Sequence, residues 1–467
     1  MSLPSSFQYV VSRLSPVVRN QVKMVAIGNS TVKPNQSLTF DLPSDSIIDL
    51  NTLCLRADYG YQYAQTATTA GSRNVPQPHT LIRSAQWSLN GSVVSGNNLQ
   101  HFGQVYEMLR RCSGSIAHGR SNLDEYSEVP QPDSNGGFQG NRSGSLYSTA
   151  TKRIHMDDFL GLQHGKNAGN FDSSLVGNIR LRLEFNGQEP VMDMSDDGSV
   201  GASANYDWQL QNCELVCDVI TFTTPDNMYD NVISALLQEG QTLQMAYPEY
   251  YSQLSSESNN TKFNVSSQSL DFIGVAPLLS TYSSGTHMQS ANTGLITTAT
   301  NSKYGPNFTR FAMTSNGSAP YGADVTTPKY YWNINQRVYP QSGNENVCDS
   351  MVHTKNCFSK GLDSQNLLFE GNLQNDNAVS FKDFETAQGS RLNFNHSNCI
   401  IFHKLCLDAP AHQSENNAVS GINTQGQSSV ISLQSTSWNS SSDFKLLVAG
   451  TSAIMEIGGG QNINITY

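Results

Sequence analysis

The feature that most constrains this chain is the alternation of apolar and polar side chains with a period of two residues. The cleanest case sets four apolar side chains against three charged ones: Ile179, Leu181, Leu183 and Phe185 against Arg180, Arg182 and Glu184. The segment 208–222 repeats the pattern with four apolar side chains: Cys213, Leu215, Cys217 and Val219. Such alternation predicts β-strands with one buried face.

The composition supports a β protein and excludes several other classes. Only 14% of the 467 residues are charged, and the many Gly, Asn, Ser and Thr residues favour strands joined by long polar loops. Aromatic residues, at 9%, run along the whole length, which argues against disorder. A net charge of −11 argues against a body that coats nucleic acid. The length predicts two or three domains.

The clearest predicted helix covers residues 226–240, close to the midpoint. Asp226 is suited to cap its N-terminus, and Gly240 stands where a helix commonly ends. The apolar residues between them follow helical spacing: Tyr229, Val232, Ile233, Leu236 and Leu237. We therefore predict a junction helix at 226–240 between two β domains, at 25–225 and 241–467.

The second half repeats the order and spacing of the first. Asn335 lies 245 residues after Asn90, within a similar tryptophan-containing hairpin pattern, and Gly426 lies 249 residues after Gly177. A helix is predicted at 99–112, and a weaker one at 344–358 follows the second hairpin. An internal repeat of short strands with inserted helices predicts an all-β protein made of two tandem eight-stranded jelly rolls.

The first 24 residues differ from the rest because they are basic and contain no acidic residue. Their apolar stripe and basic groups are Phe7, Val10, Val11, Leu14 and Val18 with Arg13, Arg19 and Lys23. One interpretation is a frayed tail. The other, which we favour, is a short amphipathic arm at 1–24 that leaves the body and contacts a partner.

No group of residues predicts catalysis or a bound metal. His155 precedes Asp157 and Asp158, but adjacent residues on a helix diverge by about 100° and could not share a substrate. His396 and His403 lie near Cys399 and Cys406 without the spacing of a metal site. We therefore expect no enzyme activity, no cofactor and no metal.

The eight cysteines form no paired motif and several lie within apolar runs. The N-terminus lacks a long apolar stretch typical of a secretion signal. We therefore expect free thiols in a protein folded inside a reducing cell.

Several segments together resemble double jelly-roll major capsid proteins of tailless icosahedral DNA viruses, which include polinton-like viruses, virophages and adenovirus-like relatives. These segments are DFLG, SSLVGNIRLRLEF, LQNCELVCDVITF, MYDNVISALLQEG, YYWNINQRVYPQ, SGINTQGQSS and AIMEIGGGQNINITY. The resemblance runs from about residue 25 to the end. It implies a virion protein, assembled inside the infected cell, whose homotrimers form pseudo-hexagonal capsomers that tile an icosahedral shell.

The resemblance also implies partners for the arm and the loops. Neighbouring capsomers, minor capsid proteins and penton proteins would contact the subunit. The arm at 1–24 would lie on the inner side of the shell, near an internal membrane or the genome. The polar segment 113–150 is expected to face the exterior or a neighbouring subunit. An alternative from another class is a tandem β-sandwich lectin-like or adhesin binding protein, because jelly rolls also serve as lectins.

Overall fold

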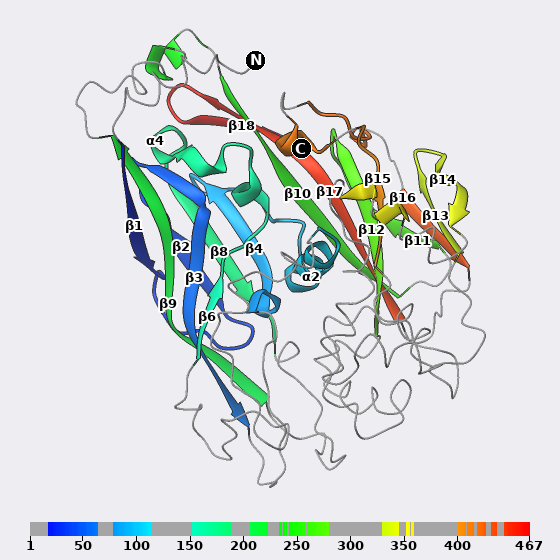
Figure 1. Cartoon of the computed structure of the whole chain (residues 1–467), viewed down its shortest axis with the longest axis horizontal. Coiled ribbons are helices and arrows are strands. Elements are labelled where there is room, and N and C mark those ends of the chain that lie inside the picture. Colours follow the sequence, from blue (N-terminus) through cyan, green and yellow to red (C-terminus); the bar gives the residue numbers. More distant parts are fainter. Residues whose placement is uncertain are drawn as a thin grey trace, which may run out of the picture.

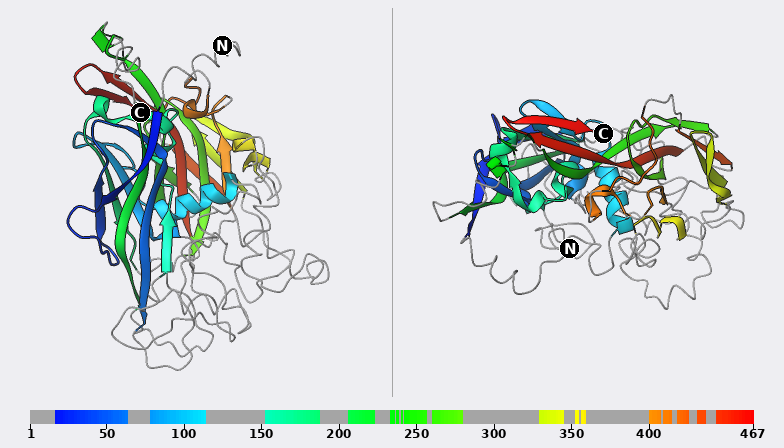
Figure 2. Two further views of the ribbon diagram at one scale, coloured as in Figure 1. Left: turned by 60° about the vertical axis from the view of Figure 1, so that its left-hand side comes forward. Right: turned by 90° about the horizontal axis from the view of Figure 1, so that it is seen from above.

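The computed structural model contains two β-sandwiches side by side, with helix α2 between them (Figure 1 and Figure 2). It describes residues 17–63, 78–113, 152–187, 206–222, 260–279, 329–344 and 443–467, and most of 233–256, 352–358 and 400–436. None of the helices in these segments is long and apolar enough to cross a membrane.

The first sandwich consists of a five-stranded and a four-stranded antiparallel sheet. One has the order β1 (Val17–Val25), β9 (Tyr206–Phe222), β3 (Ile47–Tyr63) and β6 (Lys152–Met156), with β7 (Phe171–Asp172) also paired to β3. The other has the order β2 (Ser37–Asp41), β8 (Ile179–Phe185), β4 (Ile82–Leu89) and β5 (Ser92–Ser95). The helical segments are η1 (Pro78–Leu81), α2 (Phe102–Ser113), η2 (Gly161–His164), η3 (Ala168–Asn170) and α4 (Ser173–Val176).

The second sandwich repeats this order strand by strand. Its first sheet runs β10 (Leu243–Ser255), β17 (Asp443–Gly458), β12 (Leu270–Leu279) and β15 (Ile401–Lys404), with β18 (Asn462–Thr466) added to β17. Its second sheet runs β11 (Asn260–Phe263), β16 (Ile431–Thr436), β13 (Lys329–Ile334) and β14 (Arg337–Asn344). The short helix η8 (Ala411–Gln413) precedes β16. The prediction of two eight-stranded jelly rolls is confirmed.

The hairpins β4–β5 and β13–β14 show how closely the two halves correspond. Asn90 and Asn335 begin the two turns with the same positive φ of 49°. The Asn90 side-chain oxygen accepts a hydrogen bond from the backbone N–H of Asn178 (2.9 Å), and the Asn335 amide donates to the carbonyl of Asn423 (3.4 Å). Both contacts join residues 88 positions apart. The predicted repeat is therefore present in three dimensions.

The described part of the predicted junction helix is helical at residues 233–235 and 237–238. Gly240 has a φ of +73°, and its N–H donates to the carbonyl of Leu237 at 3.2 Å. This is the left-handed glycine expected just beyond a helix C-terminus. The helix lies in the chain between the last strand of the first sandwich and the first strand of the second.

The sheet that contains β17 is buried on both faces, unlike the alternating strands of the first half. Leu446 and Val448 belong to a large apolar core shared with the first jelly roll, whereas Leu447 and Ala449 belong to the interior of the second. A strand buried on both sides needs a nearly continuous apolar run. The same physics explains the apolar run at 272–279 in β12 (Leu270–Leu279).

The N-terminal boundary differs from the prediction. Residues 17–24, expected in the arm, form most of β1 and pair antiparallel with β9, with Val22 opposite Cys217. Val22 and Met24 turn inward, while Lys23 stays exposed. β-Branched valines fit a pleated strand at least as well as a helical stripe. The prediction of a helix around Val18 was therefore wrong, and residues 17–24 belong to the first jelly roll.

Candidate functional site

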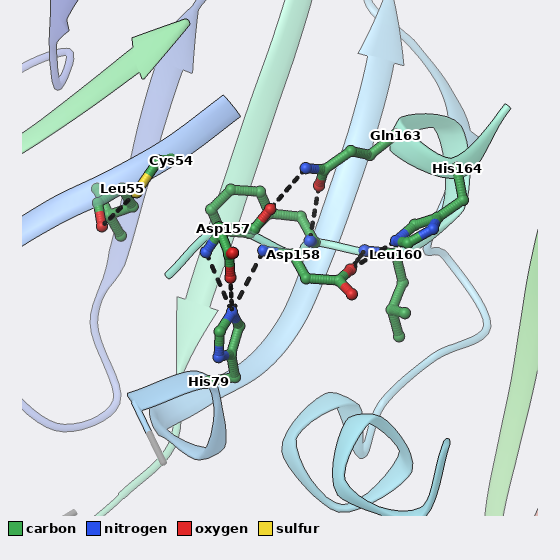
Figure 3. Close-up of polar contacts among 9 residues, drawn as sticks. Cys54, Leu55, His79, Asp157, Asp158, Leu160, Gln163 and His164 are labelled. Carbon is green, nitrogen blue, oxygen red and sulfur yellow. Dashed lines mark hydrogen bonds and ion pairs between the residues drawn. The ribbon is translucent and has the colours of Figure 1, made fainter. Parts of the chain in front are cut away.

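Asp157 and Asp158, which follow His155 in the sequence, belong to a tight turn rather than to a reaction centre (Figure 3). The buried His79 Nε2 accepts hydrogen bonds from the backbone N–H groups of Asp157 (3.1 Å) and Asp158 (3.2 Å). Gln163 accepts from the N–H of Phe159 and donates to the carbonyl of Asp157. A ring nitrogen that accepts two N–H groups belongs to a neutral imidazole. His79 therefore holds the backbone in place.

The two aspartates point to different partners, although residues 157–160 do not form the helix from which their divergence was predicted. The carboxylate of Asp157 lies 3.3 Å from His79 Nε2, whereas Asp158 lies 2.7 Å from His164 Nε2. Although burial opposes it, His164 lowers the pKa of Asp158, and the Asp158 carboxylate in turn raises the pKa of His164. His155 lies on β6 opposite Arg56 instead of in this turn. These groups do not converge on a shared substrate position.

The second predicted group is also part of the core. His403 is buried and contacts the Tyr330 hydroxyl at 3.2 Å, and its ring lies tilted against that of His353 with the ring centroids 4.6 Å apart. Burial, with His353 nearby, lowers the pKa of His403 to about 3. Cys406 is buried, while His396 and Cys399 lie outside the described residues. Within the described segments, no three His, Cys, Asp or Glu side chains are grouped to hold a metal ion.

None of the six cysteines within the described segments belongs to a disulfide: Cys54, Cys112, Cys213, Cys217, Cys357 and Cys406. Cys213 and Cys217 share the inner face of β9, where both are fully buried. Burial raises the pKa of each of these two thiols to about 12. For these six cysteines the structure agrees with the prediction that they are not paired in disulfides.

The most extensive functional feature is the joint between the two jelly rolls. Glu249 on β10 is buried and accepts hydrogen bonds from the Ser95 hydroxyl (2.6 Å) and the Gly96 N–H (2.9 Å) at the end of β5. The hydroxyls of Tyr247 and Tyr467 both donate to the carbonyl of Val94. Burial raises the pKa of Glu249 to about 7.

Backbone contacts and apolar packing complete this joint. The N–H of Lys166 donates to the carbonyl of Ala246 (3.0 Å), and the N–H of Ser252 donates to that of Asn98 (3.1 Å). One apolar core joins the two jelly rolls. It contains buried side chains of α2 and of both sheets of the first jelly roll, together with Met245, Phe402 and other residues of the second. A joint of this kind holds the two jelly rolls as one body.

The joint was not identified from the sequence. Glu249 was visible only as part of a predicted strand, and nothing marked Ser95 or Gly96 as its partners. The one available signal was an acidic residue flanked by aromatic residues in a strand, with no cation near it in the sequence. Such a position predicts a buried carboxylate, but it cannot identify the groups that bind it.

Three predicted arm residues lie on or beside the outer face of the β1–β9–β3–β6 sheet. Arg19 forms ion pairs with Asp49 and with Asp218, the latter at 2.8 Å, and Lys23 forms one with Glu214. Val18 is exposed next to them. The other arm residues, Phe7, Val10, Val11, Arg13 and Leu14, lie outside the described residues.

The ion pairs continue across the same face. Arg153 on β6 binds Asp58 at 3.0 Å and reaches over β3 to Glu214 at 3.3 Å. Burial, with Arg56 and Arg153 nearby, lowers the pKa of His155 at this edge. The face therefore carries charges of both signs that pair with one another within the chain.

Comparisons with known proteins identify the fold. No family model matches the chain, and no curated protein matches it. Among solved structures, the PBCV-1 VP54 crystal structure fitted into a reconstruction of the virophage Sputnik has a TM-score of 0.55 at 9% identity, covering 97% of this chain and 98% of that one. The PBCV-1 virus capsid model has a TM-score of 0.53, also at 9% identity and with the same coverage. The chain thus has the double jelly-roll fold of these viral capsid structures over nearly its whole length.

Proposed function

We propose that this protein is the major capsid protein of an icosahedral virus, with a structural rather than a catalytic role. The observation that carries the proposal is the buried joint, which fixes two jelly rolls of the same strand order side by side. Three such subunits would supply six similar upright units, as a pseudo-hexagonal capsomer requires. Tiled capsomers would then form the shell of a virion.

The joint also weighs against the lectin-like or adhesin alternative. Tandem binding modules usually move relative to one another, because a linker and a small interface hold them together. A large apolar interface prevents this motion. Here the two jelly rolls share one apolar core and place a buried carboxylate of one on donors of the other. This rigidity supports a building block better than a pair of separate binding modules.

Assembly of the purified full chain tests the proposal. We expect sedimentation velocity to find trimers at micromolar concentration, and electron microscopy to find six-lobed capsomers or closed shells. Alkaline or high-salt treatment of shells should release trimers before it releases monomers if the trimer is the unit from which the shell is built. A protein that stays monomeric at all concentrations and binds glycans would contradict the proposal and support the alternative.

We also propose that the residues before β1 form an arm that contacts a partner, as their composition suggests. Phe7, Val10, Val11, Arg13 and Leu14 would contact a neighbouring capsomer, a minor capsid or penton protein, or the phosphates of an internal membrane or genome. Their basic groups and apolar stripe support a surface-binding arm. Arg19 and Lys23 contribute from β1, where they already bind carboxylates of the sheet.

Deletion of residues 2–16 should leave a soluble trimer whose melting temperature is nearly unchanged and whose assembly into shells is poor. The expected reason is that β1 begins at Val17, so the cut leaves its pairing with β9 complete. A longer deletion, of residues 2–25, is the control and should destabilise the first jelly roll. Normal shell assembly by the shorter variant would show that the segment is only a tail.

A further inference from the structure

A strap of chain between β15 and β16 passes over the start of β12 in the second jelly roll. We use this name for the described residues 405–407, 409–414 and 418–421. The strap is held by Asp271 on β12, whose side chain is buried. The carboxylate of Asp271 accepts hydrogen bonds from the hydroxyls of Ser269 (2.6 Å) and Ser452 (2.6 Å). Its backbone carbonyl accepts the N–H groups of Leu405 (2.7 Å) and Cys406 (3.0 Å), which fastens the start of the strap.

The same two serines fasten the rest of the strap. The Ser452 oxygen accepts the N–H of Ala411 (3.0 Å), and the other serine oxygen accepts the N–H of Gly421 (2.9 Å). From the first jelly roll, Lys166 Nζ donates to the carbonyl of Ser414 at 2.6 Å. A backbone that is fastened at its start, middle and end presents its side chains in defined directions.

The strap exposes two apolar side chains. Leu407 is 88% exposed, the highest value among the exposed large hydrophobic residues of the described segments, and Val419 is 39% exposed. The N–H of Leu407 donates to the hydroxyl of Ser420 at 3.3 Å, which places Leu407 next to the residue that follows Val419. Because the backbone is fastened, Leu407 cannot turn inward without breaking hydrogen bonds. Neighbouring apolar side chains exposed on such a backbone form a surface suited to a partner.

The strap and the start of β1 lie at the same end of the molecule (Figure 1). Val17, the first residue of β1, pairs at that end with Phe222, the last residue of β9. Strand β1 is also the edge strand on the side of the first jelly roll away from the second (Figure 1 and Figure 2). Residues 1–16 therefore join the body at this end, but on the side away from the strap of their own chain. An extended segment of this length spans at most about 55 Å, enough to reach a neighbouring subunit.

We propose that residues 1–16 of a neighbouring copy of this chain dock on the strap at Leu407 and Val419. The inference rests on the proposed function of these residues and names the surface that receives them. Four apolar residues of the segment would cover the exposed pair: Phe7, Val10, Val11 and Leu14. Removal of these side chains from water favours the association.

The charges of the two segments are complementary. Residues 405–430, between β15 and β16, carry Asp408 and Glu415 and neither Lys nor Arg. Residues 1–16 carry Arg13 and no acidic residue. Opposite charges steer two segments together and disfavour wrong partners. Because an acidic segment repels anionic lipids and nucleic acid, the observations favour residues 1–16 as the occupant of the strap.

Cross-linking in assembled shells of the full chain tests the assignment. A benzophenone amino acid in place of Gln8 puts a photo-reactive group in the segment and leaves its apolar residues unchanged. Isotope-labelled and unlabelled protein are mixed before assembly, so a cross-linked pair with one labelled and one unlabelled peptide comes from two chains. We expect the main cross-links to join this group to peptides of another chain that contain Leu407 or Val419.

Substitutions on the strap give the second part of the test. Leu407→Asp and Val419→Asp should each lower the yield of this cross-link at least about tenfold, because a charge replaces an apolar side chain in the contact. Leu407→Met keeps an apolar side chain of similar volume and is the matched control, with a yield close to that of the unsubstituted strap. Unfolding temperatures should be nearly unchanged, because both positions are exposed. Should Leu407→Asp fail to fold, Val419→Asp decides the result.

The outcomes distinguish this inference from the capsid function. If the full chain forms neither trimers nor shells, the capsid function is wrong and the inference falls with it. If shells form but the cross-links reach other surfaces, or only the strap of the same chain, the function stands and the docking of residues 1–16 on a neighbour's strap is wrong. Equal cross-link yields from the two aspartate variants and Leu407→Met would contradict it as well.

Discussion

Replacing Gly96 with alanine is expected to lower the free energy of unfolding by roughly 2–5 kcal/mol. Gly96 has a φ of +83°, a conformation that costs an L-residue energy. An added Cβ would also lie only 1.8 Å from the carbonyl oxygen of Ala85, in the neighbouring strand β4. The Ala85 oxygen belongs to backbone held in the sheet, so it cannot move aside at little cost. The distortion would pass to Glu249, which accepts the Gly96 N–H.

Gly91 provides a matched control for this substitution. It lies in the turn before β5 with a φ of +84°, but an added Cβ would meet no atom within 4 Å. Gly91→Ala should therefore cost only the backbone term, about 1–2 kcal/mol. Urea unfolding of both variants at one protein concentration gives the comparison. Equal losses for the two variants would show that the clash with Ala85 does not govern Gly96.

Much of the fold was predictable because strand pattern and turn chemistry are local. The alternation at 179–185 gave β8, and the hairpins that begin with Asn90 and Asn335 revealed the repeat. Helix α2 was also expected, close to its observed bounds Phe102–Ser113. These signals depend on neighbouring residues, which the sequence shows directly.

The remaining features depend on contacts between distant residues. In the sequence, Val18 continues an apolar pattern of helical spacing. It nevertheless lies in a strand, because β9, about 200 positions away, offers β1 an edge to pair with. Likewise, successive residues of β17 point to opposite faces, so Leu446 and Leu447 belong to different apolar cores. An apolar run in the sequence does not show whether a strand is buried on one face or on both. The joint has the same origin, since Glu249 and Ser95 are 154 residues apart.

Stability should depend on pH through Glu249, and Glu249→Gln should remove that dependence. Burial raises the pKa of Glu249 to about 7 from an ordinary value of 4.5. Between these two pH values the folded protein holds a proton that the unfolded chain has released. Its contribution is therefore complete below about pH 4.5 and is lost as the pH rises towards 7, a change on the order of 3 kcal/mol.

Other groups titrate in the same range, so the wild-type profile alone does not isolate this effect. Burial raises the pKa of Asp271 to about 6, which acts in the same direction, and lowers that of His412 to about 4, which acts in the opposite one. The informative quantity is the difference in unfolding free energy between wild type and Glu249→Gln from pH 4.5 to 7.5. Glutamine keeps an acceptor for Gly96, while its amide can donate to the Ser95 hydroxyl.

Ser95→Ala should shift the pH dependence in the opposite sense from Glu249→Gln. The Ser95 hydroxyl bond to Glu249, at 2.6 Å, favours the ionised carboxylate and so limits the rise of its pKa. Without that bond the pKa of Glu249 should rise further, and the decline in stability should extend above pH 7. Urea titrations at fixed protein concentration measure both variants against wild type. A difference between wild type and Glu249→Gln that stays constant across this range would mean that Glu249 does not take up a proton in the joint.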